Sequence, residues 1–291
     1  MSQPLAPTTW GPYQLEWGTR TYIMGIVNAT PDSFSGDGLK QADLTVEEVV
    51  KQAVSQAQHF AGEGATFIDV GGESTRPHAL RVSAEEELAR VIPVIRAMRR
   101  ELPPETIISI DTYKAIVAEQ AIAAGANLIN DIWGFQYDPD MAVVAAEQGV
   151  PVVLMANMRG IPKKRDIISD ILRFLSTSID KALAAGVEWE RIIIDPGIGF
   201  GMTPEEDVTV LRRLGELRSL GRPILLGTSR KSHIGRILGG LPASERLEGT
   251  AATVALGIAQ GADIVRVHDV REMLRVARMS DAVVRGSFAL E

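Results

Sequence analysis

The sequence contains no cysteine among its 291 residues, and only 5% of them are aromatic. The absence of cysteine excludes disulfides, thiolate zinc sites and cysteine nucleophiles, and it fits a reducing compartment. Runs of about 18 apolar residues, the length needed to cross a membrane, are missing. The N-terminus also lacks the basic start and apolar stretch of a signal peptide. We therefore expect a cytoplasmic protein.

An excess of positive charge is also missing, since the net charge is −7. A broad nucleic-acid surface would need the opposite sign, but a few arginines focused in a cleft can still bind a small anion. Hydrophobic residues make up 45% of the chain and charged residues 23%. This composition is enough for a large core and argues against disorder.

Eight short runs rich in β-branched residues recur along the chain, and they are nearly continuous in Ile, Val and Leu, as is typical of strands covered on both faces. The runs are Thr21–Val27, Thr66–Val70, Ile107–Asp111, Asn127–Asp131, Pro151–Met155, Arg191–Asp195, Pro223–Gly227 and Asp263–Val267. Helical patterns lie between them, for example over Thr45–Glu63, Ala84–Arg100 and Pro204–Leu217. Several helical stretches are followed by a Gly-Ala step that suits a helix terminus.

Eight strand–helix units in about 270 residues have the size and rhythm of an α/β protein of the (β/α)8 TIM-barrel class. We expect residues 1–291 to form one such domain, with residues 1–18 as a lead-in that includes a strand capping the bottom of the barrel. A doubly wound open sheet is the alternative, but it would usually bring a glycine-rich dinucleotide turn after the first strand. The sequence has no such turn there.

Polar residues occur where the apolar strand runs stop, and in a barrel those positions form the face that carries active sites. They are Asp69, Asp111, Asn130, Asp131, Asn157, Asp195, His268 and Asp269. Any one of them can simply cap the following helix, and we expect that role for Asp131 and Asp269. The uniform placement of the others predicts side chains that converge on one mouth.

The segments around these strand ends are specific in sequence. They are Met24–Ser35, Gly71–Pro77, Ile110–Thr112, Ile129–Asp131, Asp195–Gly201, Gly227–Ser232, Gly249–Ala252 and Arg266–Asp269. In this order they resemble the motifs of the dihydropteroate synthase family, and the resemblance covers residues 20–285. It implies a transferase of folate biosynthesis that condenses 6-hydroxymethyl-7,8-dihydropterin diphosphate with p-aminobenzoate, giving dihydropteroate and pyrophosphate.

Four residues are assigned by this resemblance to pterin binding: Asp111, Asn130, Asp195 and Lys231. The chemistry agrees, because a carboxylate accepts two N–H bonds from an amino-pyrimidinone edge and an amide can both donate and accept. Met155 and Phe200 would form apolar walls against the ring, although simple core packing is the usual role of such residues. Arg230 is expected to point outward or into a salt bridge.

The same resemblance implies a diphosphate site made of Asn28, Arg76, Arg266 and His268, which together with Lys231 are the expected catalytic residues. Arginine gives bidentate bonds to phosphate, and the alternation of Arg266 and His268 places both on one face of a strand. Asn28 would meet the Mg²⁺ or the diphosphate, since Mg²⁺ prefers oxygen ligands and phosphate.

The p-aminobenzoate pocket is expected at Phe34, Thr75, Arg76, Pro77 and Ser232, with the carboxylate near the N-terminus of the helix after Lys231. No strong general base is required, because an aromatic amine is already a neutral nucleophile. Compounds that imitate p-aminobenzoate, such as sulfonamides, should compete. A homodimer is expected, as is common in this family and among symmetric enzymes.

Five positions depart from the pattern expected for the family: Ala156, Met202, Asp207, His78 and His233. Ala156 and Met202 remove polar groups near the mouth. A non-catalytic pterin-binding paralogue is therefore one alternative. A methyltetrahydrofolate:corrinoid methyltransferase is the other alternative, because it shares the Asp, Asn and Asp residues that bind the pterin. Its reaction needs no diphosphate site, so Asn28, Arg76 and His268 argue against it.

Overall fold

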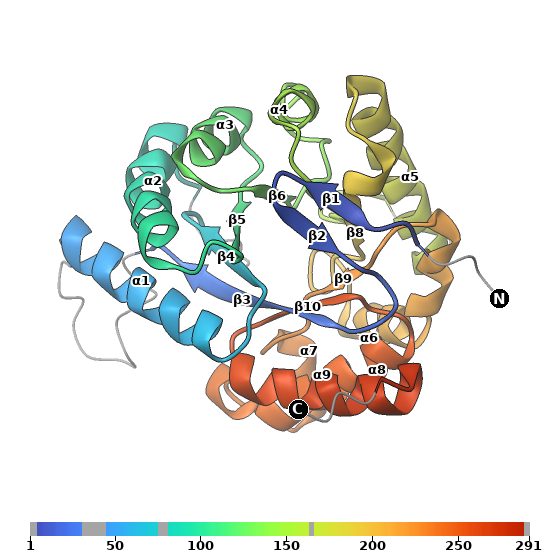
Figure 1. Ribbon diagram of the computed structural model, residues 1–291. Helices are drawn as coiled ribbons and strands as arrows, with labels where there is room; N and C mark the ends of the chain where they lie inside the picture. Colours follow the sequence, from blue (N-terminus) through green and yellow to red (C-terminus); the bar gives the residue numbers. More distant parts are fainter. Residues whose placement is uncertain (1–4, 31–44, 75–80, 163–165, 288–291) are drawn as a thin grey trace.

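The computed structural model describes residues 5–30, 45–74, 81–162 and 166–287. Eight parallel strands lie side by side in the order β8-β7-β6-β5-β4-β3-β10-β9. A parallel bridge between Ile194 on β8 and Ile224 just before β9 joins the two edges of this sheet. The strands therefore form a nearly closed barrel with helices around it, and the predicted (β/α)8 fold is confirmed (Figure 1).

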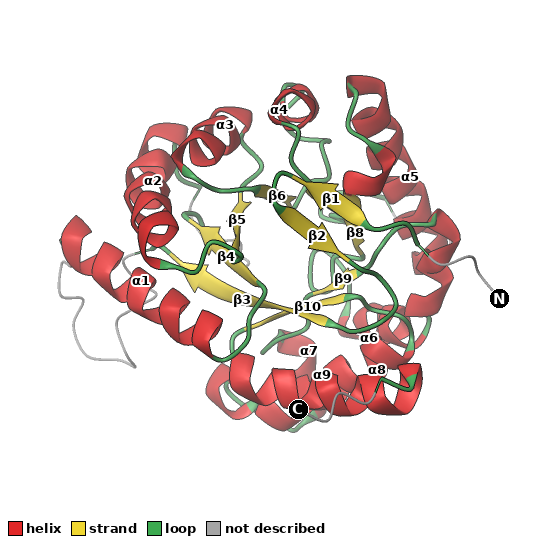
Figure 2. Ribbon diagram, viewed as in Figure 1, coloured by secondary structure: helices red, strands yellow, loops and turns green. Residues whose placement is uncertain are grey.

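The eight predicted strands are all present, with ends that shift by one or two residues. They are β3 Tyr22–Asn28, β4 Phe67–Gly71, β5 Ile107–Asp111, β6 Leu128–Asp131, β7 Val152–Met155, β8 Ile192–Asp195, β9 Leu225–Leu226 and β10 Ile264–Val267. Each is followed by a helical segment packed on the outside of the barrel, so each strand is covered on both faces (Figure 2).

The α-helices among the described residues are α1 Val46–Gly62, α2 Ala84–Glu101, α3 Ala115–Ala124, α4 Met141–Gln148, α5 Ile167–Ala185, α6 Pro204–Arg212, α7 Ser232–Ile237, α8 Leu247–Ala259 and α9 Val270–Arg285. Thr45 and Thr203 begin α1 and α6 with full capping boxes. The helix predicted over Pro204–Leu217 ends as an α-helix at Arg212, and the chain continues as a 3₁₀ helix over Leu214–Leu220.

The predicted lead-in contains two short strands, β1 Thr8–Trp10 and β2 Tyr13–Leu15, which form an antiparallel hairpin. The hairpin lies across one end of the barrel in Figure 1. Its Trp10 and Leu15 pack in one cluster with inward-facing residues at the starts of the strands, such as Phe67 and Ile107. The amino-terminal end of the barrel is therefore closed, and the opposite end carries the mouth.

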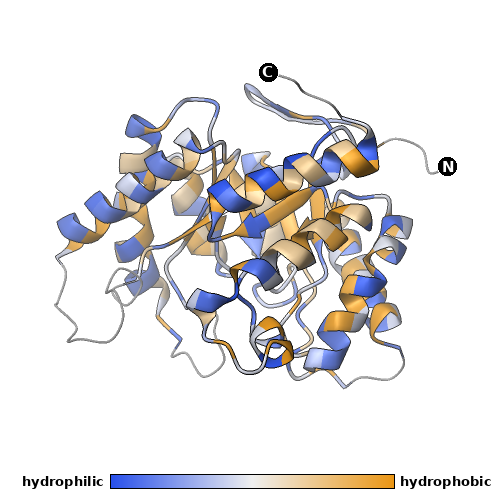
Figure 3. Cartoon of the chain, turned by 90° about the horizontal axis from the view of Figure 1, so that it is seen from below, coloured by the Kyte–Doolittle hydropathy of each residue, from blue (hydrophilic) through white to orange (hydrophobic). Residues whose placement is uncertain are grey.

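Hydrophobic residues line the strands, and hydrophilic residues gather on the outer faces of the helices (Figure 3). The larger core cluster lies between strands and helices, with residues such as Ile23, Ile68 and Ile108. Within the described residues, no helix combines the length and apolar character needed to cross a membrane.

Candidate active site at the carboxyl ends of the strands

The inner face of the barrel changes from apolar to polar within two residues along several strands. Side chains alternate with period two in a strand, so residues i and i+2 share a face. The bottom inward-facing cluster contains Phe67, Leu128, Ile193 and Ile264. Two residues further along these strands stand Asp69, Asn130, Asp195 and Arg266. The sequence thus builds a polar layer directly above an apolar floor.

Arg266 lies at the centre of this polar layer. Its Nε donates to Asp69 Oδ2 at 2.6 Å and its Nη2 donates to Asp111 Oδ2 at 2.7 Å. The same Asp69 oxygen also accepts from Asn130 Nδ2 at 3.0 Å. Asp69 is fully buried and is the third of the five residues of β4, so it lies below the mouth and not at a strand end as predicted. Its role is to hold Arg266 and Asn130 in place.

A row of four residues crosses the mouth in register. Asn28 pairs with Gly71, Gly71 with Asp111, and Asp111 with Asn130. At Gly71 an added Cβ would lie 3.6 Å from Asp111 Cβ and 3.9 Å from Asn28 Oδ1. Because this position carries no side chain, the half-buried Asn28 amide and the Asp111 carboxyl can share one space.

Asp195 and Lys231 face the same space from the other side of the barrel. Asp195 Oδ1 accepts from Gly197 N at 2.7 Å, and Oδ2 lies 4.0 Å from the point where a Cβ would stand on Gly227. Burial raises the pKa of Asp195 to about 6, and burial lowers the pKa of Lys231 to about 8. Burial likewise raises the pKa of Asp111, against the opposing effect of Arg266. Burial thus perturbs three of the predicted pterin ligands, a common property of functional sites.

An apolar cluster forms one wall of this space. Met155 and Phe200, both predicted as walls, pack together with Tyr113, Ile132 and the partly buried Trp133. The ammonium of Lys231 lies 4.4 Å from the centre of the Phe200 ring, and the Arg159 guanidinium lies 4.7 Å from it. Two cationic groups therefore lie close to the Phe200 ring of this wall.

His268 and Arg230 have partners that fix their orientation. His268 Nδ1 lies 2.9 Å from Ser229 Oγ, which also accepts from His268 N at 3.1 Å. Burial, with Arg230 and Arg266 nearby, lowers the pKa of His268 to about 3, so its ring is neutral near pH 7. Arg230 forms two bonds to Asp269, at 3.1 and 2.5 Å. The salt bridge predicted for Arg230 is confirmed.

Neither of the two predicted helix caps bonds to the first turn of a helix. Asp131 accepts from Trp133 N and Phe135 N, both at 2.8 Å, so it holds the turn after β6, whereas the following helix α4 has Asp140 at its N-cap position. Asp269 occupies the N-cap position of α9 but makes no side-chain cap bond there, because its carboxylate pairs with Arg230. The capping prediction was therefore wrong for both residues.

Several supporting residues were not predicted from the sequence. Ser229 orients His268. Thr250 Oγ1 accepts from Arg230 N at 3.1 Å and so supports Arg230, whose φ is +57°. Tyr113 donates to Glu73 at 2.9 Å and also joins the apolar wall. Such partners are far apart in sequence, and a serine, threonine or tyrosine carries no local signal of this role.

The remaining predicted residues have clear placements or fall outside the described chain. Phe34, Thr75, Arg76, Pro77 and His78 lie outside the described residues. Ser232 is exposed in the first turn of α7, a helix of only six residues.

Two of the unusual positions, Ala156 and Met202, remove nothing that the described site uses. Ala156 is buried, its N–H donates to Asp195 O at 2.9 Å, and its oxygen lies 1.8 Å from where a Cβ would stand on Gly197. Met202 packs against the core.

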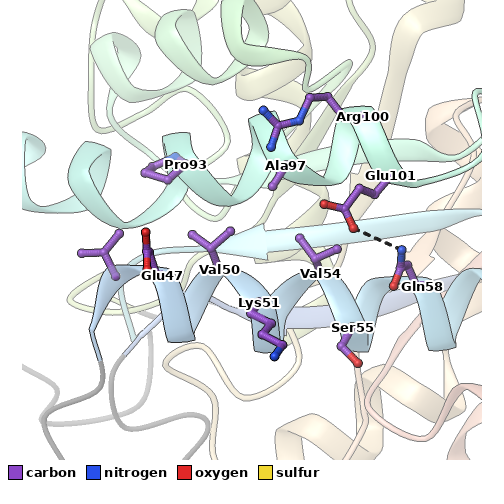
Figure 4. A pocket seen from close by; sticks show the side chains of 11 residues that line it. Glu47, Val50, Lys51, Val54, Ser55, Gln58, Pro93, Ala97, Arg100 and Glu101 are labelled. Carbon is purple, nitrogen blue, oxygen red and sulfur yellow. Dashed lines mark hydrogen bonds between the residues drawn. The ribbon is translucent and has the colours of Figure 1, made fainter.

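A groove of about 560 Å³ lies elsewhere, between α1 and α2 on the outside of the barrel (Figure 4). It is lined by side chains such as Val50, Val54 and Ala97, with a bond from Gln58 Nε2 to Glu101 Oε2 at 3.3 Å. None of the polar residues of the barrel mouth line it. The mouth is therefore the better candidate for chemistry.

Metal binding by protein groups alone finds little support in the described part of the chain, where no three or more His, Asp or Glu side chains come together as a metal site. Asn28 at the mouth offers a neutral amide oxygen beside Asp111. This donor set suits Mg²⁺ only when phosphate oxygens and water complete the shell, which is the usual manner in which Mg²⁺ is bound.

Residues 24–268 match the family model described as pterin binding enzyme. The chain belongs to the pterin-binding enzymes, within the dihydropteroate synthase family. A dihydropteroate synthase from Clostridium beijerinckii is 53% identical over 276 residues, which cover 94% of this chain and 98% of the relative.

Solved structures of the dihydropteroate synthase family share this fold. The enzyme from Clostridium difficile, crystallised in the presence of pteroic acid, has a TM-score of 0.87 at 49% identity, covering 93% of this chain and 99% of its own. One from Xanthomonas albilineans with 4-aminobenzoic acid has a TM-score of 0.84 at 40% identity, covering 93% and 95%. One from Yersinia pestis with a sulfonamide drug has a TM-score of 0.85 at 38% identity, covering 96% and 98%.

Proposed function

We propose that this chain, acting as one barrel domain, joins 6-hydroxymethyl-7,8-dihydropterin diphosphate to p-aminobenzoate at the barrel mouth. The observation that carries this proposal is that Asp111, Asn130 and Asp195 face one space with Lys231. Family membership supports the same reaction, since close relatives are dihydropteroate synthases. The corrinoid methyltransferase alternative has no support from these relatives.

The pterin would lie flat against the wall of Met155 and Phe200, with its amino-pyrimidinone edge toward the polar layer. Asp111 would accept N–H bonds from that edge, because burial removes competing water and strengthens each bond. Asn130 donates one amide hydrogen to Asp69. The amide orientation this favours leaves its oxygen as an acceptor for the ligand. Lys231 would donate to a ring oxygen or nitrogen.

The diphosphate would lie above Arg266 and His268. Arg266 already uses Nε and Nη2 on two carboxylates, so Nη1 is the nitrogen left to meet a phosphate oxygen. Ser229 Oγ accepts from His268 N, so its own hydrogen can point to Nδ1 and place the imidazole proton on Nε2. A neutral imidazole would then donate to phosphate without titrating near pH 7.

Mg²⁺ would bind between Asn28 and the diphosphate, where it supplies charge stabilisation for the leaving group. The protein's own task is mainly positioning. The pterin nitrogens can stabilise positive charge on the methylene carbon, and the aromatic amine attacks as a neutral nucleophile. We assign Ser232, with Phe34, Thr75, Arg76 and Pro77, to the p-aminobenzoate side. Because α7 has only six residues, its dipole adds little there.

Pyrophosphate release with both substrates tests this proposal. We expect turnover that depends on Mg²⁺, is abolished by a chelator, and is inhibited by a sulfonamide in competition with p-aminobenzoate. Omitting either substrate is the control. A purified, folded protein that binds the pterin but releases no pyrophosphate would instead be a non-catalytic paralogue.

The pH dependence of the reaction should follow the buried charges of the site. Asp111 and Asp195 must both be ionised to accept from the pterin, and burial raises their pKa values to about 7 and about 6. The kcat/KM for the pterin diphosphate should therefore fall as the pH drops from about 7 through about 6. Lys231 must be protonated to donate, so kcat/KM should also fall above about 8. Lys231→Met should remove the basic limb. Binding of unphosphorylated 6-hydroxymethylpterin is the control, because it excludes ionisation of the diphosphate; a flat binding profile would contradict the assignment.

A homodimer is proposed through the outer faces of α8 and α9. Leu256, Met279 and Val283 expose 63%, 65% and 72% of their surface on these two helices, which pack against each other. We expect Val283→Glu to shift the protein from dimer to monomer by analytical ultracentrifugation. Val143→Glu, an equally apolar exposed position on α4, should leave the dimer intact. A wild type that sediments as a monomer would refute the interface.

A further inference from the structure

A buried carboxylate and a buried imidazole meet behind the wall of the site. Asp207 on α6 and His233 on α7 expose only 3% and 1% of their surface. His233 Nδ1 lies 3.4 Å from Asp207 Oδ2, and neither ring nitrogen has a hydrogen-bond partner in the described part of the chain. Buried polar groups are costly to keep without full hydrogen bonding. This pair therefore calls for an explanation beyond packing.

Asp207 also holds the loop that carries Phe200. Its other oxygen, Oδ1, accepts from Gly199 N at 2.7 Å. Gly199 has a φ of +80°, and a Cβ there would lie 3.2 Å from Lys231 Cδ. The backbone at Gly199 thus passes directly against the Lys231 side chain, and the next residue is Phe200.

The backbone on either side of Gly199 is tightly held, so a change at Gly199 cannot be absorbed by its neighbours. Its flanking glycines also have positive φ, and a Cβ on Gly201 would lie 2.4 Å from Arg159 N. Phe200 N donates to Gly197 O at 3.0 Å, and Phe200 O accepts from Met158 N at 2.9 Å. A shift of Gly199 would therefore move the Phe200 ring and the Lys231 ammonium that lies over it.

We infer that Asp207 and His233 act as paired positioning residues that fix Gly199, and through it place Phe200 and Lys231 against the pterin. Asp207 makes the bond to the loop, and His233 stands beside its second oxygen at the start of α7, two residues after Lys231. The pair connects α6, the glycine loop and α7 at one point. This inference rests on the proposed function for its ligand, the pterin, and adds two residues that do not touch it.

The test compares variants that keep or remove each half of the pair. Asp207→Ala removes the acceptor for Gly199 and should raise the KM for the pterin diphosphate about tenfold, with kcat changed less than about threefold. Asp207→Asn keeps an acceptor oxygen and should stay within about twofold of wild type. The KM for p-aminobenzoate should change little in all variants.

Rescue provides the sharper test. His233→Leu leaves a buried carboxylate without its neighbour and should raise the pterin KM about fivefold, whereas Asp207→Asn combined with His233→Leu should recover nearly wild-type KM, since a neutral amide needs no imidazole. A double variant no better than His233→Leu would overturn the inference, and so would an unchanged pterin KM in Asp207→Ala.

The control is Asp281→Ala at the opposite end of the barrel. Asp281 is also buried and also accepts a backbone N–H, from Thr21 at 2.7 Å. It should lower the Tm without changing the pterin KM; an equal rise in KM would show that general loss of stability explains the effect. Calorimetric binding of 6-hydroxymethylpterin, read alongside turnover, separates the two proposals. A wild type that binds pterin but lacks turnover refutes the function and leaves the pair testable by affinity.

Discussion

Asp111→Ala should abolish measurable pterin binding while leaving a folded protein. In the proposed site Asp111 would supply a carboxylate to the pterin, and its Oδ2 accepts from Arg266 Nη2 at 2.7 Å. Loss of two charge-assisted hydrogen bonds, at about 1.5–3 kcal/mol each, weakens affinity at least about a hundredfold. Isothermal titration with 6-hydroxymethylpterin measures this directly.

Asp138→Ala is the matched control for Asp111→Ala. Asp138 lies after β6 and accepts from Ala115 N at 2.8 Å, outside the polar layer. This variant should lose some stability and bind pterin normally. Normal pterin affinity in Asp111→Ala would show that the pterin site is placed wrongly.

Arg266→Met should cause the largest loss of stability. The substitution leaves Asp69 and Asp111 as two buried carboxylates without their shared cation. Removing one partner of a buried ion pair costs about 3–5 kcal/mol in the free energy of unfolding. The loss should be greatest near pH 8 and smaller near pH 6. Burial already raises the pKa of Asp111, and loss of the arginine removes the charge that opposes this effect, so protonation at lower pH removes an unpaired charge.

Arg230→Met is the comparison for Arg266→Met, because it removes a more exposed ion pair and should lower the free energy of unfolding much less. Arg230 also uses Nε and Nη2 on one carboxylate, but its side chain is 36% exposed, against 22% for Arg266. A cost of about 0–1 kcal/mol is expected there. Urea titrations of both variants at the two pH values make the comparison. If both variants lost the same free energy of unfolding at both pH values, the central position of Arg266 between the two carboxylates would be contradicted.

The strands and their inner face could be predicted from the sequence because their signal is local. Runs such as Ile107–Asp111 combine β-branched residues with a polar end, and parallel strands bring such ends to one face. The same logic placed Asn130 and Asp195 at the mouth. The hydrophobic pattern alone does not identify the ligand. The expectation of a pterin came from the resemblance to the family motifs.

The partners of these residues could not be predicted, because they depend on contacts across the barrel. Asp69 was expected at a strand end, and only the register shows that it pairs with Ser109, two residues before Asp111. Asp269 had the position of a helix cap, yet an arginine 39 residues away takes its carboxylate. Asp207 and His233 stood out only as unusual residues, and nothing in their spacing indicates that they meet.

The hairpin of β1 and β2 determines from which end of the barrel ligands enter. Because it closes the amino-terminal end, both substrates would enter, and the product would leave, at the carboxyl ends of the strands. In the proposed arrangement the pterin would lie deeper than the amine, against the polar layer, so it would have to enter first. A dihydropteroate molecule still at the mouth would block the next pterin, so a new cycle would start only after the product has left.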